Sequence, residues 1–270
     1  MHEARLPWQR GAAFFFRHLL DGDPASSTLS WRWVAGLQTP GKTYLARRSN
    51  LEKYLASQLL DSLSDGLAAF ENPQALQPEP ISQPGTTRPD WPVERLTSSP
   101  ATGLWIHEED LAIETSSLKS QSFSAILVTG DADIWNHHQF PLIKRQWITD
   151  ALRDAATRAE LIWKAPTSVE NRTSTEEAIV AWAIANKLDQ VAAMRPGIGP
   201  IHDSLSKLRA ALACADVRLV LMERAGDVNI RHFASGGFFQ FWERVKKTLV
   251  TSPGGHDSLV KQQLTIDFPQ

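Results

Sequence analysis

The segment Phe123-Ser-Ala-Ile-Leu-Val-Thr-Gly130 decides the fold class of this 270-residue chain. Its apolar run is rich in β-branched residues and ends at a glycine, which is the pattern of a strand buried on both faces. A helical pattern follows from Leu142 to Ala159. A buried strand followed by a long helix is the start of a right-handed βαβ unit, so the sequence predicts a parallel sheet.

The same alternation of strand and helix continues toward the C-terminus. Three further strands are predicted, at Leu161–Ala165, Gln190–Met194 and Val217–Met222. The helices between them are predicted to begin at a cap formed by Thr173 or Ser174, with Glu176 and Glu177 at capping-box spacing, and to span Ile201–Ala213. We therefore predict a doubly wound α/β domain with a parallel sheet over residues 102–270.

Upstream of this domain lies a proline-rich stretch. Seven prolines fall between Asn72 and Pro100, among Gln, Ser, Thr and Glu residues. Proline fixes φ and removes a backbone donor, so neither a helix nor a ladder of hydrogen bonds can run through this stretch. We predict a linker over residues 71–101, and the chain is thus expected to be an α+β protein of more than one domain.

The first 70 residues form the remaining predicted domain, and its pattern is helical. Apolar residues lie around most of the wheel from Trp8 to Leu20, which predicts a deeply buried helix. Asp23 is placed to cap a second helix that Pro24 begins. A third helix, capped by Ser49 or Asn50, is predicted to run through Tyr54 and Leu59.

Composition narrows the class of protein. The chain is 42% hydrophobic and 21% charged, which excludes a disordered or collagen-like chain. Its single cysteine, Cys214, can form neither an internal disulfide nor a cysteine cage for a metal. No apolar run approaches the roughly eighteen residues that cross a bilayer. We expect a cytoplasmic protein with no membrane partner.

Basic residues are concentrated at the N-terminal end. Residues 1–60 carry eight Lys and Arg against four Asp and Glu, although the whole chain has a net charge of −2. Such an excess is suited to phosphate contacts, and it is also what an ordinary solvated face looks like. Charge alone leaves both interpretations open.

Three tryptophans accompany an acidic turn in this basic segment. Trp8, Trp31 and Trp33 lie near Asp21 and Asp23 in the sequence. Tryptophans with a nearby carboxylate suit a large aromatic cofactor or electron hopping, whereas tryptophans that simply fill a helical core are the ordinary alternative.

The order of these residues resembles a known family. The run Asp21-Gly-Asp-Pro-Ala-Ser-Ser-Thr-Leu-Ser-Trp-Arg-Trp-Val-Ala-Gly36, with Trp8 before it and Tyr44 to Tyr54 after it, is similar to the C-terminal part of the FAD-binding domain of the DNA photolyase/cryptochrome family. The resemblance covers residues 5–58. It implies FAD as the cofactor and light-driven repair of pyrimidine dimers, a carbon–carbon lyase reaction on a base extruded from damaged DNA.

The resemblance also implies roles for individual residues. Asp21, Asp23 and Ser27 match positions beside the flavin. Trp31 matches the tryptophan nearest the flavin, and Trp8 the next one outward in an electron-hopping chain. The residues implied in binding damaged DNA are Trp33, which matches the tryptophan lining the lesion pocket, and Arg32, which contributes basic character together with Lys42, Arg47 and Arg48.

Two differences from the family point to an alternative to the flavin-dependent repair function. Ser27 stands where photolyases carry an asparagine, and a serine is too short to offer the same carboxamide hydrogen bond. The chain also carries only the last part of the flavin domain, so a further chain supplying the missing half is an expected partner. The alternative is a non-catalytic remnant or interaction module that no longer binds flavin.

Other candidates carry weaker signals, and we predict no metal site. The run His107-Glu108-Glu109-Asp110 offers ligands for a hard cation, but an acidic helix start explains it more simply. His137 and His138 are adjacent and lack a partner at helical metal-site spacing, so they are expected to be surface or turn residues. Cys214 is predicted to be a small core residue. The α/β domain is also similar in architecture to the antenna-type domain of photolyases.

Overall fold

The computed structural model describes residues 8–37, 45–76, 94–233 and 238–251. The chain divides into two compact units, Met1–Met222 and Glu223–Gln270. The larger unit holds a sheet and the N-terminal helices, and the smaller one holds helices α9 (Ala225–Arg231) and α10 (Phe238–Thr251).

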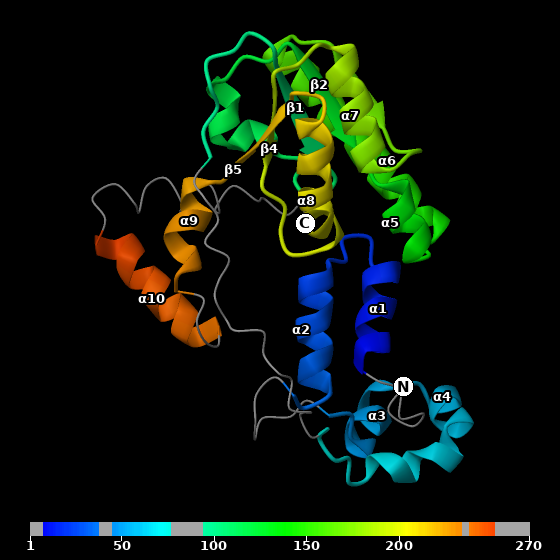
Figure 1. Cartoon of the computed structure of the whole chain (residues 1–270). Helices are drawn as coiled ribbons and strands as arrows, with labels where there is room; N and C mark the ends of the chain where they lie inside the picture. Colours follow the sequence, from blue (N-terminus) through cyan, green and yellow to red (C-terminus); the bar gives the residue numbers. More distant parts are fainter. Residues whose placement is uncertain (1–7, 38–44, 77–93, 234–237, 252–270) are drawn as a thin grey trace. The chain divides into compact units, whose positions relative to one another are not determined.

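A five-stranded sheet forms the centre of the larger unit (Figure 1). All of its pairings are parallel, and the strand order is β3-β2-β1-β4-β5. The strands are β1 (Thr102–His107), β2 (Ala125–Thr129), β3 (Thr167–Glu170), β4 (Gln190–Met194) and β5 (Arg218–Met222). Leu104 of β1 lies between Ile126 of β2 and Ala192 of β4, so β1 is the central strand.

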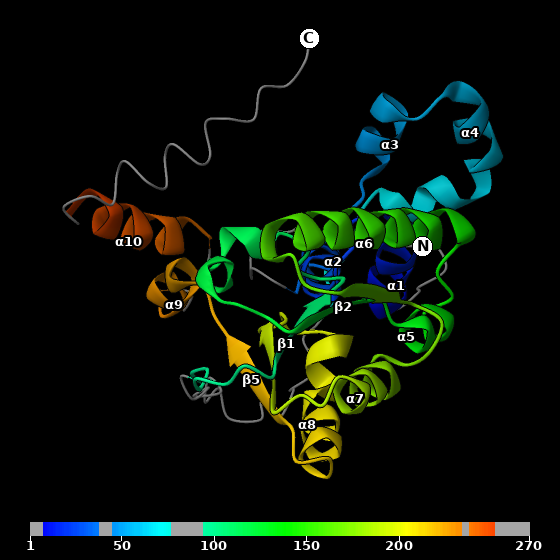
Figure 2. The same cartoon turned by 90° about the horizontal axis from the view of Figure 1, so that it is seen from above.

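Helices cover both faces of this sheet. One core contains Leu104, Ile106 and Leu152, and the other contains Trp105 and Leu208. Viewed from above, α6 lies along one face, and α7 and α8 lie along the other (Figure 2). The helices that follow the strands are α5 (Ala132–His137), α6 (Leu142–Trp163), α7 (Thr175–Ala185) and α8 (Pro200–Ala213). The predicted parallel sheet with helical crossovers is confirmed.

One strand assignment from the sequence is wrong, and one strand was not predicted. The predicted strand at Leu161–Ala165 begins inside the last turn of α6, which ends where Lys164 adopts a left-handed conformation with φ of 51°. The third strand is instead Thr167–Glu170. The central strand β1 was not predicted, and the expected acidic helix start at His107 is wrong because His107 ends that strand.

A buried aspartate joins two helix starts at the carboxyl edge of the sheet. Asp131 follows β2, and its Oδ1 accepts a hydrogen bond from the amide of Ile134 in α5 at 2.9 Å. Its Oδ2 accepts one from the amide of Thr175 in α7 at 3.1 Å. One side chain therefore accepts hydrogen bonds from first-turn amides of two helices. These amides have no carbonyl partner within their own helix.

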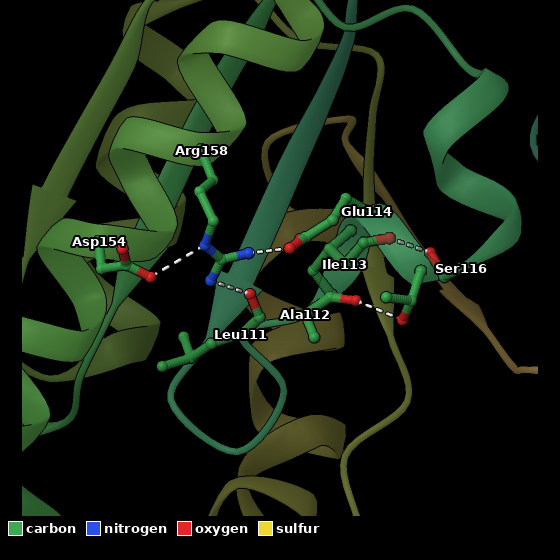
Figure 3. A network of polar contacts seen from close by, with 8 residues as sticks. Leu111, Ala112, Ile113, Glu114, Ser116, Asp154 and Arg158 are labelled. Carbon is green, nitrogen blue, oxygen red and sulfur yellow. Dashed lines mark hydrogen bonds and ion pairs between the residues drawn. The ribbon is translucent and has the colours of Figure 1, made fainter. Parts of the chain in front are cut away.

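The connection from β1 to β2 contains two 3-10 turns, η2 (Ile113–Thr115) and η3 (Ser117–Ser120), and α6 fastens it. Arg158 of α6 donates to Glu114, to the carbonyl oxygen of Leu111 at 2.9 Å and to Asp154 at 2.9 Å (Figure 3). A planar guanidinium with five donors is suited to such a fork of acceptors. The network ties the loop after β1 to the helix that covers it.

The N-terminal residues form helices, as predicted, but with different burial and bounds. These helices are α1 (Trp8–His18), α2 (Pro24–Val34), α3 (Arg48–Tyr54), α4 (Ser57–Ser62) and the 3-10 helix η1 (Ser64–Phe70). The deeply buried helix expected at Trp8–Leu20 is wrong, because only Gly11, Ala12 and Phe16 of α1 are buried. The third predicted helix is in fact two helices, α3 and α4. The N-cap of α3 is Arg47 and not Ser49 or Asn50.

The end of the proline-rich stretch lies against the α/β domain. Residues 77–93, which hold most of its prolines, fall outside the described part of the chain. Beyond them, Glu94 accepts hydrogen bonds from the amide of Leu221 and from Arg209, both at 2.7 Å. Thr97 bonds Gln190, and Ser99 bonds Asp189 at 2.6 Å. The boundaries at residues 71 and 101 stay a prediction.

The structure also shows where Cys214 lies and whether any helix is long enough to cross a membrane. Cys214 is exposed, so its predicted place in the core is wrong. Within the described residues, no helix is both long enough and apolar enough to span a bilayer.

Candidate functional site

The residues singled out in the sequence lie on a hairpin of two helices, α1 and α2. Asp23 has an extended backbone, and its Oδ1 accepts hydrogen bonds from the amides of Ala25 at 2.9 Å and Ser26 at 3.2 Å. Pro24 supplies a first helical residue that needs no amide donor. Asp23 thus acts as the predicted N-cap of α2, while Asp21 is an exposed residue of the turn.

The two helices meet closely where Gly11 of α1 faces Trp31 of α2. A Cβ atom at Gly11 would lie 2.3 Å from the Trp31 ring, so only glycine admits the ring at this distance. Phe15 packs on the same ring, with centroids 5.5 Å apart. Ser27, one helical turn before Trp31, is buried. The face of α2 that carries Ser27 and Trp31 is therefore turned toward α1.

The outer residues of the hairpin form a second set of contacts. The guanidinium of Arg32 lies 5.6 Å from the centre of the half-buried Trp8 ring, a cation–π arrangement that links α2 back to α1. Trp33 is 38% exposed, and Phe14 and Phe15 are 47% and 40% exposed. The hairpin therefore presents aromatic rings at its surface.

Only some of the basic residues that the resemblance implies for DNA contacts are free of other charge partners. Arg48 forms ion pairs with Glu52 and Glu71, each at 2.7 Å, so much of its charge is compensated. Arg47 is the N-cap residue of α3, and its side chain forms no cap hydrogen bond. Lys42 lies outside the described residues.

The hairpin also meets the carboxyl edge of the sheet through buried Lys144 of α6. Its Nζ donates to the carbonyl oxygen of Phe16 at 2.5 Å and to that of Gly22 at 3.4 Å. The same ammonium lies 4.9 Å from the ring centre of Phe16 and 4.1 Å from that of Phe140. Burial lowers the pKa of Lys144, and the nearby Glu108 and Asp21 act in the opposite direction.

A groove of about 580 Å³ runs beside this contact. Residues of α2, α8 and the end of α5 line it, among them Pro24, Arg32, His138, Gly199 and Asp203. Neither Ser27 nor Trp31 lines the groove, so it does not unite the residues that the sequence singled out.

Two glutamates after β1, Glu108 and Glu109, belong to the run that the sequence analysis interpreted as an acidic helix start, and their raised pKa values were not predicted. The carboxylate of Glu108 accepts a hydrogen bond from Trp135 Nε1 at 2.8 Å. Burial, reinforced by the charges of Asp131 and Glu109, raises the pKa of Glu108 to about 8. Burial, with Asp23 and Asp203 nearby, raises the pKa of Glu109 to about 7. The sequence signal that could have indicated this site is a pair of acidic residues directly after an apolar run.

The hairpin carries groups that suit a flavin, but its described residues do not enclose a site for one. Its surface aromatics and the exposed carboxylate of Asp21 suit a large heteroaromatic cofactor. Asp23, Ser27 and Trp31 are committed to contacts within the hairpin, and no described groove is lined by all three. Among the described residues, no group of three or more His, Cys, Asp or Glu is placed to hold a metal ion.

Comparison with known proteins identifies the hairpin segment. Residues 1–58 match the family described as the FAD binding domain of DNA photolyase. The resemblance predicted from the sequence is thereby confirmed over this segment, and FAD is the cofactor that it indicates. No curated protein and no solved structure matches the chain. The match supports a flavin-binding role of the photolyase type for the segment.

Proposed function

We propose that residues 1–58 form one wall of a photolyase/cryptochrome-type flavin site. A second chain that supplies the remainder of the flavin domain completes this site. The completed assembly carries out light-driven repair of pyrimidine dimers in DNA. The observation that carries the proposal is the family match over residues 1–58.

A partner chain is supported by the surface of the hairpin. Phe14, Phe15, Leu19 and Leu29 are each at least 40% exposed, and they lie on α1, directly after it, or on α2. Several large exposed apolar side chains on so short a segment favour an interface with a partner. A helical partner that buries these side chains would complete the aromatic wall at the same time.

In this proposal the tryptophans carry charge to the cofactor. Bound FAD, in its reduced and light-excited form, supplies the electron for dimer cleavage. Trp31 is held rigidly between Gly11 and Phe15, and Trp8 is held by Arg32. Such immobilised rings suit Trp31 as the inner and Trp8 as the outer residue of an electron path. Asp21 and Asp23 provide negative charge at the turn.

The simplest form of the proposal has a second copy of this chain complete the site, and it predicts that the full chain retains flavin by itself. After incubation with FAD and gel filtration, we expect absorption bands of bound flavin at near-stoichiometric amounts, in a fraction larger than the 30.1 kDa monomer. The larger mass is expected because one hairpin supplies only one wall. Trp31→Ala should reduce the retained flavin at least tenfold, since the ring organises the hairpin. Absorption and light scattering on the same fractions measure both quantities.

Trp147→Ala is the matched control for this experiment, because Trp147 is 46% exposed on α6 and belongs to the α/β domain. It should leave flavin retention unchanged. A colourless wild-type protein at every concentration contradicts completion of the site by copies of this chain and favours the non-catalytic alternative.

Damaged DNA is the proposed substrate, and Trp33 is the residue proposed to stack on it. Base stacking on an aromatic ring contributes about 1–3 kcal/mol. Trp33→Ala in the flavin-loaded assembly should therefore weaken binding of a dimer-containing duplex by about fivefold to a hundredfold, with little change for undamaged DNA. Titration of both duplexes at fixed salt measures this. Equal weakening for both duplexes would show that Trp33 does not contact the lesion.

A non-catalytic interaction module is the second candidate function. The observation favouring it is the commitment of Asp23, Ser27 and Trp31 to contacts within the chain. A module of this kind is expected to take up no flavin, and its exposed hairpin would still serve as a binding face for a partner. For either function we propose a cytoplasmic location, which the single cysteine supports.

A further inference from the structure

Helix α6 carries large apolar side chains on the side turned away from the sheet. Its buried residues recur every three or four positions and mark the side that faces the core. They are Lys144, Ile148, Leu152, Ala155 and Ala159. Leu142, Ile143 and Leu161 lie outside this set and are 84%, 70% and 72% exposed, and Trp147 is 46% exposed. Apolar side chains of this size are unfavourable in water, so a partner that buries this side of α6 is stabilised by doing so.

The N-terminal half of α6 forms a groove, and the C-terminal end carries a single projecting leucine. The groove has a volume of about 690 Å³, and residues of α6 alone line it. Among them, Ile143, Gln146, Trp147 and Asp150 have the spacing i, i+3, i+4 and i+7. Four residues at this spacing form the hole that receives one side chain of a facing helix. Leu161 is an exposed side chain of the size that fills such a hole.

Charges of both signs lie between the groove and Leu161. Arg153 forms an ion pair with Asp150 at 2.9 Å, and both side chains are at least 60% exposed. Asp154, on the next turn, is 69% exposed. A surface with a single sign of charge would repel a copy of itself, whereas this mixed surface is compatible with one.

An antiparallel pair of α6 helices makes this surface complementary to itself. A twofold axis reverses the second helix, so the Leu161 end of each copy lies over the groove of the other. The axis then passes close to Arg153 and Asp154, which are about halfway between the groove and Leu161. The arginine of one copy is thereby brought toward the aspartates of the other. A parallel pair would place groove on groove and leave both holes unfilled.

We propose that α6 binds the α6 helix of a second copy of this chain in antiparallel orientation, with Leu161 of each copy in the groove of the other. One helix from each copy buries less surface than a standard protein interface, so we expect a weak dimer with a dissociation constant in the micromolar range or above. This inference does not rest on flavin binding, because the contacting residues belong to α6 and none belongs to the hairpin.

Sedimentation equilibrium of the full chain without FAD tests the contact. We expect a monomer–dimer equilibrium in the wild type. Leu161→Ala and Trp147→Ala should each raise the dissociation constant about tenfold or more, because one removes the knob and the other a wall of the hole. The double variant should be weakened by less than the product of the two single effects, since the two side chains contact each other.

Ile184→Ala is the matched control, because Ile184 is 57% exposed on α7, which lies on the other face of the sheet. It should leave the dissociation constant unchanged. Leu29→Ala separates this contact from association through the hairpin, since Leu29 is 47% exposed on α2. It should also leave the dissociation constant unchanged in the absence of FAD.

Disulfide formation between copies tests the orientation of the two helices. Arg153→Cys and Gln146→Cys are made in a Cys214→Ser background, which removes the exposed native thiol, and both new positions are exposed. Under mild oxidation, Arg153→Cys should form a covalent dimer on a non-reducing gel, because the two copies of this residue lie beside the twofold axis. Gln146→Cys should stay monomeric, because its two copies lie at opposite ends of the contact.

Three results overturn the proposal. They are a wild-type chain that stays monomeric at every concentration, association that Leu161→Ala and Trp147→Ala leave as tight as in the wild type, and covalent dimers formed equally by both cysteine variants. Association that is lost in Leu29→Ala but kept in Leu161→Ala assigns the contact to the hairpin and also overturns it. A colourless chain with a dimer that depends on Leu161 supports the α6 contact, even though it contradicts completion of the flavin site by copies of this chain.

Discussion

Replacing Leu152 with alanine is expected to lower the free energy of unfolding of the α/β domain by about 2–5 kcal/mol. Leu152 is completely buried in the core between α6 and the sheet. A Cβ atom at Gly130 would lie 3.0 Å from Leu152 Cδ1, so the side chain packs directly beneath the end of β2. The truncation leaves a cavity that the surrounding sheet cannot fill. Denaturant unfolding followed by circular dichroism measures the loss.

Leu161→Ala is the matched control for this substitution. Leu161 lies on the same helix and is 72% exposed, so its truncation should change the free energy of unfolding by less than about 0.5 kcal/mol. Equal effects of the two substitutions would mean that α6 does not pack on the sheet as described.

Replacing Gly11 with valine is expected to separate α1 from α2. The Trp31 ring occupies the space that the new side chain needs, with 2.3 Å between the ring and a Cβ atom at Gly11. Overpacking of this kind costs about 1–3 kcal/mol or more, and a hairpin with so little buried surface has little reserve. We expect a red-shifted tryptophan emission and, in the flavin assay, loss of retained FAD.

Ala13→Val controls for the lower helix propensity of valine, because Ala13 is an exposed residue of the same helix. It should leave both the emission and the flavin retention close to wild type. If Gly11→Val behaves like Ala13→Val, the close contact with Trp31 does not hold the hairpin together.

Local sequence signals determined much of this protein. Apolar runs located β2, β4 and β5, because strands buried on both faces carry no polar alternation. Side chains that cap helices act on amides two or three residues away, so Asp23 and Ser174 were found without any knowledge of the fold. The order of tryptophans and aspartates over residues 1–58 was sufficient to indicate a photolyase-type flavin segment.

Where local sequence signals conflicted, the tertiary structure decided which secondary structure formed and which residues were buried. Leu161–Ala165 has the composition of a strand, but α6 continues to Trp163, whose ring packs on Phe123 while Leu161 stays exposed. β1 includes a glycine and ends in a histidine followed by acids, and only its position between β2 and β4 makes it the central strand. The apolar pattern of α1 predicts burial, yet two short helices cannot cover all of its residues.

The surroundings of Glu109 illustrate the same division most clearly. Glu109, Asp23 and Asp203 come from three separate parts of the sequence, and Lys144 comes from a fourth. Desolvation and charge repulsion depend on distance through space, so no spacing along the chain reveals them. The sequence by itself determined which helices and strands can form and which family the N-terminal segment resembles. The tertiary structure decided which charges meet, because only folding brings the turn of the hairpin to the edge of the sheet.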